Sequence, residues 1–262
     1  MRELERDSSP DTRACTRLAI VGRGRVGAAF AGALGRAGYE VSGPLGHGAD
    51  GLGADAVLLC VPDAEIERAA AHIVPGPLVG HCSGATGLGE LTPHEAFSLH
   101  PLMTVTAQGA DFAGAGAAIA GTTPRALGLA AELAAALGMR AVEVADEDRA
   151  AYHAAASIAS NFLVTLEAAA ERIAGAAGVE REQLVPLVRA TVENWARLGP
   201  ERALTGPVAR GDEATIERQR AAVEDAAPDL VPLFDELVTA TRALVAANRP
   251  LASTPAREVH PG

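Results

Sequence analysis

The chain has 262 residues, of which 48% are hydrophobic, so it can bury a core sufficient for one large or two modest domains. Its formal net charge of −11, without a dense basic run, argues against a nucleic acid or an anionic membrane as partner. No stretch approaches the roughly 18 uninterrupted apolar residues of a membrane span. The three cysteines are odd in number and unpaired in spacing, which fits a reduced, cytoplasmic setting.

The first part of the chain alternates between two kinds of pattern. Residues 1–16 are charged and unlike a signal peptide, so we predict a disordered leader. Short apolar runs then predict strands at 17–21, 39–43, 54–62, 77–84, 95–102, 116–121 and 139–144. Segments of helical pattern between some of them predict helices at 28–38, 64–74 and 123–138. This alternation is typical of a mostly parallel, doubly wound α/β domain, which we place at 17–145.

The pattern becomes helical throughout from residue 146. A helix of about 30 residues is expected to begin with Asp146 as its N-cap and to end at Gly175 or Gly178. Further segments of helical period follow, so we predict an all-α domain for substrate binding and dimerisation at 146–248. Residues 249–262 are predicted to form a disordered tail.

A glycine-rich loop follows the first strand. It matches G-x-G-x-x-G with the residues Gly22, Arg23, Gly24, Arg25, Val26 and Gly27. The first Gly permits a tight turn, the second lets the backbone approach a pyrophosphate, and the third permits contact between helix and strand. The start of the following helix offers amide donors and a partial positive charge. Because a strand precedes the loop and a helix follows it, we predict a dinucleotide site.

The end of the second strand decides between NAD and NADP. An acidic residue there would hold the ribose 2′-hydroxyl of NAD. The region instead reads Val41 to Pro44, with Glu40 at the start of the strand. No carboxylate is placed to repel a 2′-phosphate, and Arg23, Arg25 or Ser42 could receive one. NADP is therefore favoured over NAD.

The other predicted strands also end in residues that can line a ligand crevice, since ligands bind at the carboxyl ends of strands in open α/β sheets. Val61 and Pro62 end the central strand and are predicted to border the nicotinamide. Ser83 ends the next strand and is predicted to contact the cofactor. His100 is a candidate for binding the substrate, or alternatively a loop histidine bonded to backbone. The remaining histidines lack the spacing of metal ligands, so no metal site is expected.

A polar stripe interrupts the apolar segment YHAAASIASNF, residues 152–162. At about 100° per residue, an α-helix would place the side chains of His153, Ser157, Ser160 and Asn161 on one face. That face should border the crevice, although a stripe bonded to itself would also explain the pattern. In a later turn, Arg210 can anchor a substrate carboxylate or pair with a neighbouring acid.

These segments together resemble a known superfamily. GRGRVG, ADAVLLCVPD, HCSGATG and SLHPL, followed by a long helix with a spaced Asn, resemble Rossmann reductases that have an all-helical C-terminal domain. Among them are ketopantoate reductase, pyrroline-5-carboxylate reductase, and 6-phosphogluconate, 3-hydroxyisobutyrate and prephenate dehydrogenases. YHAAASIASNF and ALTGPVARGD look most like a group of Rossmann-like proteins with a ketopantoate-reductase-like C-terminal domain. The resemblance covers about residues 17–248.

The resemblance implies an NADP(H)-dependent oxidoreductase that transfers a hydride to or from a small keto or imino acid, and a homodimer. Ketopantoate reductases carry a Lys-x-x-x-Asn motif on the first long helix of the second domain. Asn161 matches that Asn, but Ser157 stands at the Lys, and the sequence contains no lysine at all. Pyrroline-5-carboxylate reductases act on an imine without this lysine, so a keto acid and an imine both remain open as substrate.

Hydride transfer to C=O or C=N also needs a polarised acceptor and a proton source. Asn161 and Ser157 can donate hydrogen bonds to an oxygen that gains charge. His153 is the predicted proton donor, because imidazole titrates near neutral pH. His100, Ser160 and Arg210 are predicted to bind the substrate. The missing lysine also supports an alternative function, a non-catalytic dinucleotide-binding sensor or scaffold.

Overall fold

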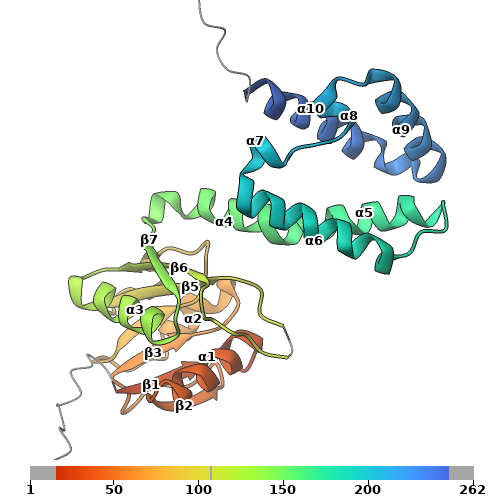
Figure 1. Ribbon diagram of the computed structural model, residues 1–262. Coiled ribbons are helices and arrows are strands. Elements are labelled where there is room, and N and C mark those ends of the chain that lie inside the picture. Colours follow the sequence, from red (N-terminus) through yellow and green to blue (C-terminus); the bar gives the residue numbers. More distant parts are fainter. Residues whose placement is uncertain (1–15, 107, 248–262) are drawn as a thin grey trace, which may run out of the picture. The chain divides into compact units, whose positions relative to one another are not determined.

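The computed structural model describes residues 16–106 and 108–247 (Figure 1). The predicted tail, and the predicted leader apart from Thr16, lie outside these residues. The chain divides into two compact units, with the boundary between Asn161 and Phe162. Our sequence-based boundary lay after residue 145, so the sheet-containing unit extends into the first helix beyond the last strand.

The first unit is built on one mixed sheet. Within the described residues it has seven strands in the order β2-β1-β3-β4-β5-β6-β7. Their bounds are β1 Arg17–Val21, β2 Glu40–Leu45, β3 Ala56–Leu59, β4 Leu78–His81, β5 Ala96–Leu102, β6 Gly116–Gly121 and β7 Arg140–Glu143. Neighbouring strands are parallel except for β5 and β6, which pair antiparallel. The carboxyl ends of β1 to β5 therefore meet at one edge of the sheet.

Alternating side chains fill a core on each face of the sheet. Leu18 and Ile20 of β1 face the cluster that contains buried residues of helices α1 (Arg25–Arg36) and α3 (Pro124–Ala136). The side chains that point to the other face of the sheet form a second cluster with α2 (Ile66–Ala70) and the short helix η2 (Leu88–Leu91). These two apolar layers confirm the predicted α/β architecture.

The segment after β7 is not one continuous α-helix, which corrects our expectation. It comprises a 3₁₀ turn η3 (Asp146–Asp148), α4 (Arg149–Ser157), a π-helical turn η4 (Ile158–Phe162) and α5 (Leu163–Gly175). A π turn closes i→i+5 hydrogen bonds and changes the angular spacing of side chains. The spacing of 100° per residue therefore fails from Ile158 onward.

The second unit is helical, as predicted. After α5 it contains α6 (Arg181–Leu198), α7 (Pro200–Ala203), α8 (Pro207–Arg210), α9 (Glu213–Ala226), η5 (Pro228–Leu230) and α10 (Val231–Ala247). The carboxylate of Asp212 accepts the Thr215 amide at 3.1 Å and caps α9, as its position before that helix predicts. No helix among the described residues is both long enough and apolar enough to cross a bilayer.

Candidate functional site

The glycine loop joins β1 to α1, and packing accounts for two of its three glycines. A Cβ on Gly22, whose φ is +122°, would lie 2.1 Å from the carbonyl oxygen of Cys60. A Cβ on Gly27 would lie 2.0 Å from the carbonyl oxygen of Gly22. A Cβ on Gly24 would meet no described atom within 4 Å. The protein itself gives no steric reason for Gly24, which leaves this side of the loop open to a ligand.

The N-terminus of α1 has the features of an anion-binding site. Gly24 occupies the N-cap position, no side chain caps the helix, and its first turn contains no acidic residue. Backbone amides at a helix start that lack an intrahelical partner favour a phosphate or carboxylate. Together with the open side of Gly24, this geometry suits the pyrophosphate of a dinucleotide.

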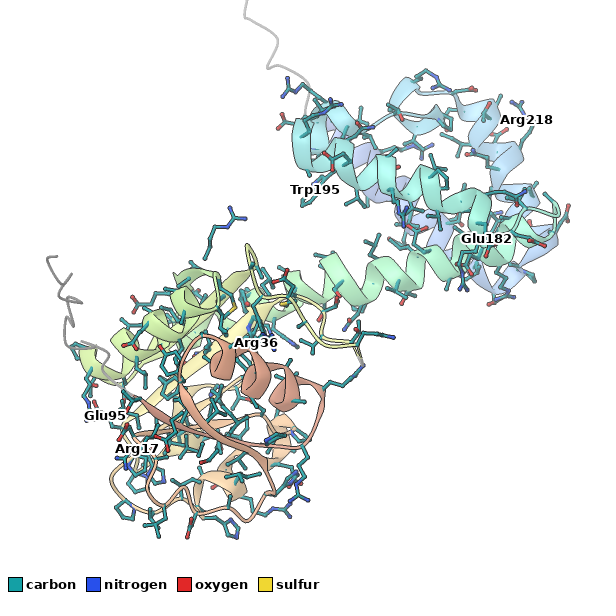
Figure 2. All side chains as sticks on the ribbon, turned by 60° about the horizontal axis from the view of Figure 1, so that its bottom comes forward. Arg17, Arg36, Glu95, Glu182, Trp195 and Arg218 are labelled. Atoms are coloured by element: carbon teal, nitrogen blue, oxygen red, sulfur yellow. The ribbon has the colours of Figure 1, made fainter. Side chains whose placement is uncertain are left out.

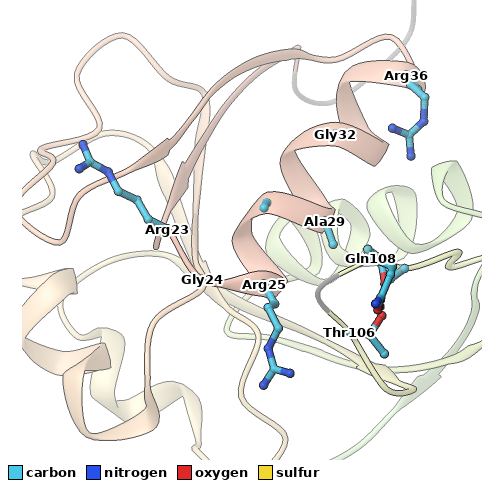
Figure 3. A pocket seen from close by; sticks show the side chains of 11 residues that line it. Arg23, Gly24, Arg25, Ala29, Gly32, Arg36, Thr106 and Gln108 are labelled. Carbon is cyan, nitrogen blue, oxygen red and sulfur yellow. Dashed lines mark hydrogen bonds between the residues drawn. The ribbon is translucent and has the colours of Figure 1, made fainter.

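A cavity of about 510 Å³ adjoins the loop along α1 (Figure 3). Arg23, Arg25 and Arg36 line it, with Thr106 and Gln108 on the opposite wall. None of the three arginines forms an ion pair with another described residue. Uncompensated guanidinium groups in a chain of net charge −11 favour an anionic ligand here.

Arg23 extends toward the end of β2. A Cβ on Gly46, the residue after that strand, would lie 3.9 Å from Nη2 of Arg23. Ser42 instead lies within β2 and lines a separate cavity of about 130 Å³, together with Glu40. The structure thus brings Arg23, but not Ser42, to the strand end that neighbours the loop.

The ends of β3 and β4 lie side by side next to the glycine loop. Cys60 and Cys82 follow these strands, and their thiols are 3.2 Å apart. A Cβ on Gly27 would be 3.4 Å from the Cβ of Cys60. Val61 and Pro62 continue from Cys60, so the structure places them at the sheet edge where we predicted the nicotinamide.

Ser83 belongs to the same edge, but its hydroxyl is engaged within its own turn. Its Oγ accepts the amides of Ala85 and Thr86 at 3.1 and 2.9 Å and lies 2.9 Å from Oγ1 of Thr86. Ser83 therefore shapes the turn after β4. A contact between Ser83 and the cofactor stays a prediction.

A buried arginine that sequence analysis missed lies beside β5. Arg149, the first residue of α4, is only 1% exposed. Its Nε donates to Oδ1 of Asp146 at 2.8 Å and its Nη2 donates to Oγ of Ser98 at 2.5 Å. Asp146 also accepts the amide of Leu88 at 3.1 Å. Asp146 therefore links Arg149 of α4 to the start of η2, and Asp148, not Asp146, occupies the N-cap position of α4.

A tyrosine of α4 and a histidine of β5 form a hydrogen-bonded pair in the same region. Nδ1 of His100 and the hydroxyl oxygen of Tyr152 are 2.7 Å apart, and the rings meet edge to face with centroids at 5.5 Å. The ring of His153 lies 6.3 Å from that of His100. A Cβ on Gly84 would come within 2.8 Å of the His100 ring. This position in the turn after β4 must therefore be glycine to leave room for the imidazole.

Burial and charge hold two histidines of this cluster neutral. Burial, followed by the positive charge of Arg149, lowers the pKa of His81 to about 4. Burial, followed by His153 and Arg149, lowers the pKa of His100 to about 4. Asp63, at the start of the helix that follows Pro62, acts in the opposite direction on both pKa values. Both imidazoles are therefore uncharged at neutral pH.

The predicted stripe is only partly brought to this cluster. His153 lies on α4 beside His100 and is exposed, and Ser157 ends α4. Ser160 and Asn161 lie in the π turn η4, where the expected common face is not maintained. Arg210 ends α8 in the second unit and acts electrostatically on Asp212. The roles assigned to these residues stay predictions.

Comparisons with other proteins concern mainly the fold. A family model described as a domain of unknown function (DUF2520) matches residues 115–241, and no curated protein matches the chain. A proposed NADP oxidoreductase from Bacteroides fragilis is 21% identical with a TM-score of 0.75, covering 88% of this chain and 99% of its own. A Thermotoga maritima protein is 25% identical with a TM-score of 0.72, covering 89% and 100%.

More distant similarity extends to enzymes with a bound cofactor. The pyrroline carboxylate reductase of Plasmodium falciparum, solved with NADP bound, is 13% identical with a TM-score of 0.56. The match covers 88% of this chain and 98% of the reductase. The chain therefore has the fold of a Rossmann-type α/β unit followed by an all-α unit.

Proposed function

We propose that the protein is an NADP(H)-dependent oxidoreductase that transfers a hydride to or from a small keto or imino acid. The observation that carries this proposal is Gly24, which no described neighbour requires to be glycine, at the uncapped start of α1. The NADP oxidoreductase assignment in Bacteroides fragilis and the NADP-bound reductase of Plasmodium falciparum, both of the same fold, give further support.

The residues of the sheet edge fit the needs of this reaction. Bound NADP would lie with its pyrophosphate at Gly24 and its 2′-phosphate near Arg23. Its nicotinamide, which supplies or accepts the hydride, would border Val61 and Pro62. Ser157 and Asn161 would donate hydrogen bonds to the acceptor atom of the substrate.

The choice of cofactor is tested at Arg23. We expect Arg23→Ala to weaken NADPH binding about tenfold, because a charge-assisted contact to phosphate is lost, and to leave NADH binding nearly unchanged. Fluorescence titration of each cofactor measures both affinities. Arg125→Ala is the matched control, because Arg125 pairs with Glu95 on the surface. Equal weakening of NADPH and NADH would contradict the assignment, and failure of the wild type to bind either cofactor would refute the proposed function.

We further propose that the protein is a homodimer through its second unit. Large apolar side chains of this unit remain more than 40% exposed, namely Phe162, Val164, Leu187, Val192, Trp195 and Leu237. Trp195, labelled on α6 in Figure 2, is 57% exposed. Three of these side chains, Leu187, Val192 and Trp195, lie on α6, and we propose this helix as the association surface. The net charge of −11 and the lack of a dense basic run in the sequence give no support to a nucleic acid or membrane as further partner.

The oligomeric state gives a direct test. We expect wild-type protein to sediment at twice its chain mass of 26.6 kDa in analytical ultracentrifugation. Trp195→Glu should shift it toward the monomer, because burying an unpaired carboxylate at an interface is costly. Glu193→Gln, two residues away on the same helix, is the control. A monomeric wild type at micromolar concentration would contradict the dimer.

A further inference from the structure

Tyr152 and His100 place an O–H group beside an imidazole, at the sheet edge where we propose that the reaction takes place. His100 comes from β5 and Tyr152 from α4, and the two heavy atoms are 2.7 Å apart. Asp63, next to the predicted nicotinamide border at Pro62, acts electrostatically on His100. The pair therefore lies within electrostatic reach of the strand end at which the hydride is expected to be transferred.

A comparison of the two tyrosines of the chain shows which one is available for chemistry. Tyr39 is 5% exposed, packs in the apolar core and has its hydroxyl 2.9 Å from a carboxylate oxygen of Glu132. Tyr152 is only half-buried, and its hydroxyl meets His100. Tyr39 is a packing residue, whereas the half-buried Tyr152 pairs its hydroxyl with an imidazole.

The pKa of the Tyr152 hydroxyl is raised overall, and the charge of Arg149 opposes this effect. Burial raises the pKa of Tyr152, while the positive charge of Arg149 and the backbone of Ala118 act in the opposite direction. Nη1 of Arg149 is buried and forms no hydrogen bond with any described residue. The positive charge of this guanidinium would therefore stabilise a transient tyrosinate.

Resting on the proposed function, we propose that Tyr152 is the residue that gives the proton to the substrate and that His100 replaces it. The hydride from NADPH forms a C–H bond at the carbonyl or imine carbon, and the π electrons move to the oxygen or nitrogen. That atom takes the proton of the Tyr152 hydroxyl. The tyrosinate then takes the Nδ1 proton of His100, whose Nε2 takes a proton from water.

This assignment changes the role of His153. His153 is exposed, and its ring is 6.3 Å from that of His100, so it lies on the solvent side of the pair. The groups that face His100 are Tyr152 and His153 from α4, with Arg149, Asp63 and His81 acting from greater range. His153 assists the supply of protons from water, and Tyr152 is the group that contacts the substrate.

Turnover with NADPH and a panel of keto and cyclic imino acids tests the donor. Tyr152→Phe should lower kcat by about 100-fold or more and leave the Kd for NADPH within about twofold, because only the hydroxyl is removed. His153→Ala should lower kcat no more than about tenfold. Tyr39→Phe makes the same chemical change in the core and should keep full turnover. Full turnover by Tyr152→Phe would overturn the proposal.

A second measurement needs no substrate. In Tyr39→Phe protein, Tyr152 is the sole tyrosine, so ultraviolet absorbance reports its ionisation alone. Replacing His100 with Phe, which preserves a ring, should raise the Tyr152 midpoint by about one pH unit or more, because tyrosinate loses its Nδ1–H donor. An unchanged or lower midpoint in a variant with a native circular dichroism spectrum would overturn the relay, even if NADPH binds. Loss of NADPH binding by wild type would instead refute the proposed function and with it the donor role, whereas the midpoint measurement would still report the contact between Tyr152 and His100.

Discussion

Alanine at Gly24 is expected to weaken NADPH binding by at least about tenfold with little change in stability, whereas alanine at Gly27 should strongly destabilise the fold. A methyl group on Gly24 would meet only the bound cofactor, since no described atom lies within 4 Å. A methyl group on Gly27 would lie 2.0 Å from the backbone oxygen of Gly22, which cannot move without displacing β1. We expect a loss of about 3 kcal/mol or more for Gly27→Ala.

Fluorescence titration and urea unfolding separate these two effects. Gly35→Ala is the matched control, because Gly35 lies in the same helix and a Cβ there also meets nothing within 4 Å. Gly35→Ala should keep NADPH affinity and raise stability by roughly 0.5–1 kcal/mol, since alanine favours helix. Wild-type affinity in Gly24→Ala would mean that the cofactor does not contact this part of the loop.

Acidification is expected to destabilise the first unit between about pH 6.5 and pH 4. His81 and His100 have a pKa of about 4 in the folded protein, against 6.5 when unfolded. The unfolded chain therefore binds protons first, and stability present above pH 6.5 is lost as the pH falls toward 4. Each histidine contributes up to about 3 kcal/mol to this loss.

Urea unfolding followed by circular dichroism over this pH range measures the effect. Carboxylates with a lowered pKa, such as those of Asp55 and Asp146, lose their contribution mainly at lower pH, below the usual range of free carboxyls. His81→Gln should reduce the pH dependence, and His72→Gln, at an exposed position, should preserve it. Stability that stays constant or rises from pH 6.5 to 4 would show that these imidazoles are charged in the folded state.

The fold could be predicted because its signals are local. The apolar runs of β1 and β3, the glycine loop and the helical period after residue 146 each follow from neighbouring residues. The π turn at Ile158–Phe162 was missed, since no simple sequence pattern distinguishes it from an α-helix. We placed Ser42 at the end of the second strand. In the structure β2 runs on to Leu45, past a shift in its pairing with β1, so Ser42 lies inside the strand.

The polar cluster around His100 could be predicted only in part, because its contacts join residues that are far apart in the sequence. His100 was identified because it lies near the end of a strand, where ligands bind. Tyr152 stood beside His153 in the same segment but was counted among the apolar residues. Its contact with His100 joins β5 to α4 across 52 residues, and no local pattern indicates it. The buried Arg149 depends likewise on Ser98, 51 residues away.

The anchoring of α4 has a mechanical consequence. Arg149 fixes the first turn of this helix to Ser98 of β5, and Asp146 fixes the same turn to the backbone of Leu88. The boundary between the two units comes only later, at the π turn, between Asn161 and Phe162. Tyr152 thus precedes the boundary and belongs to the same compact unit as His100. Substitutions confined to the helical unit should therefore leave the distance between its hydroxyl and Nδ1 of His100 unchanged.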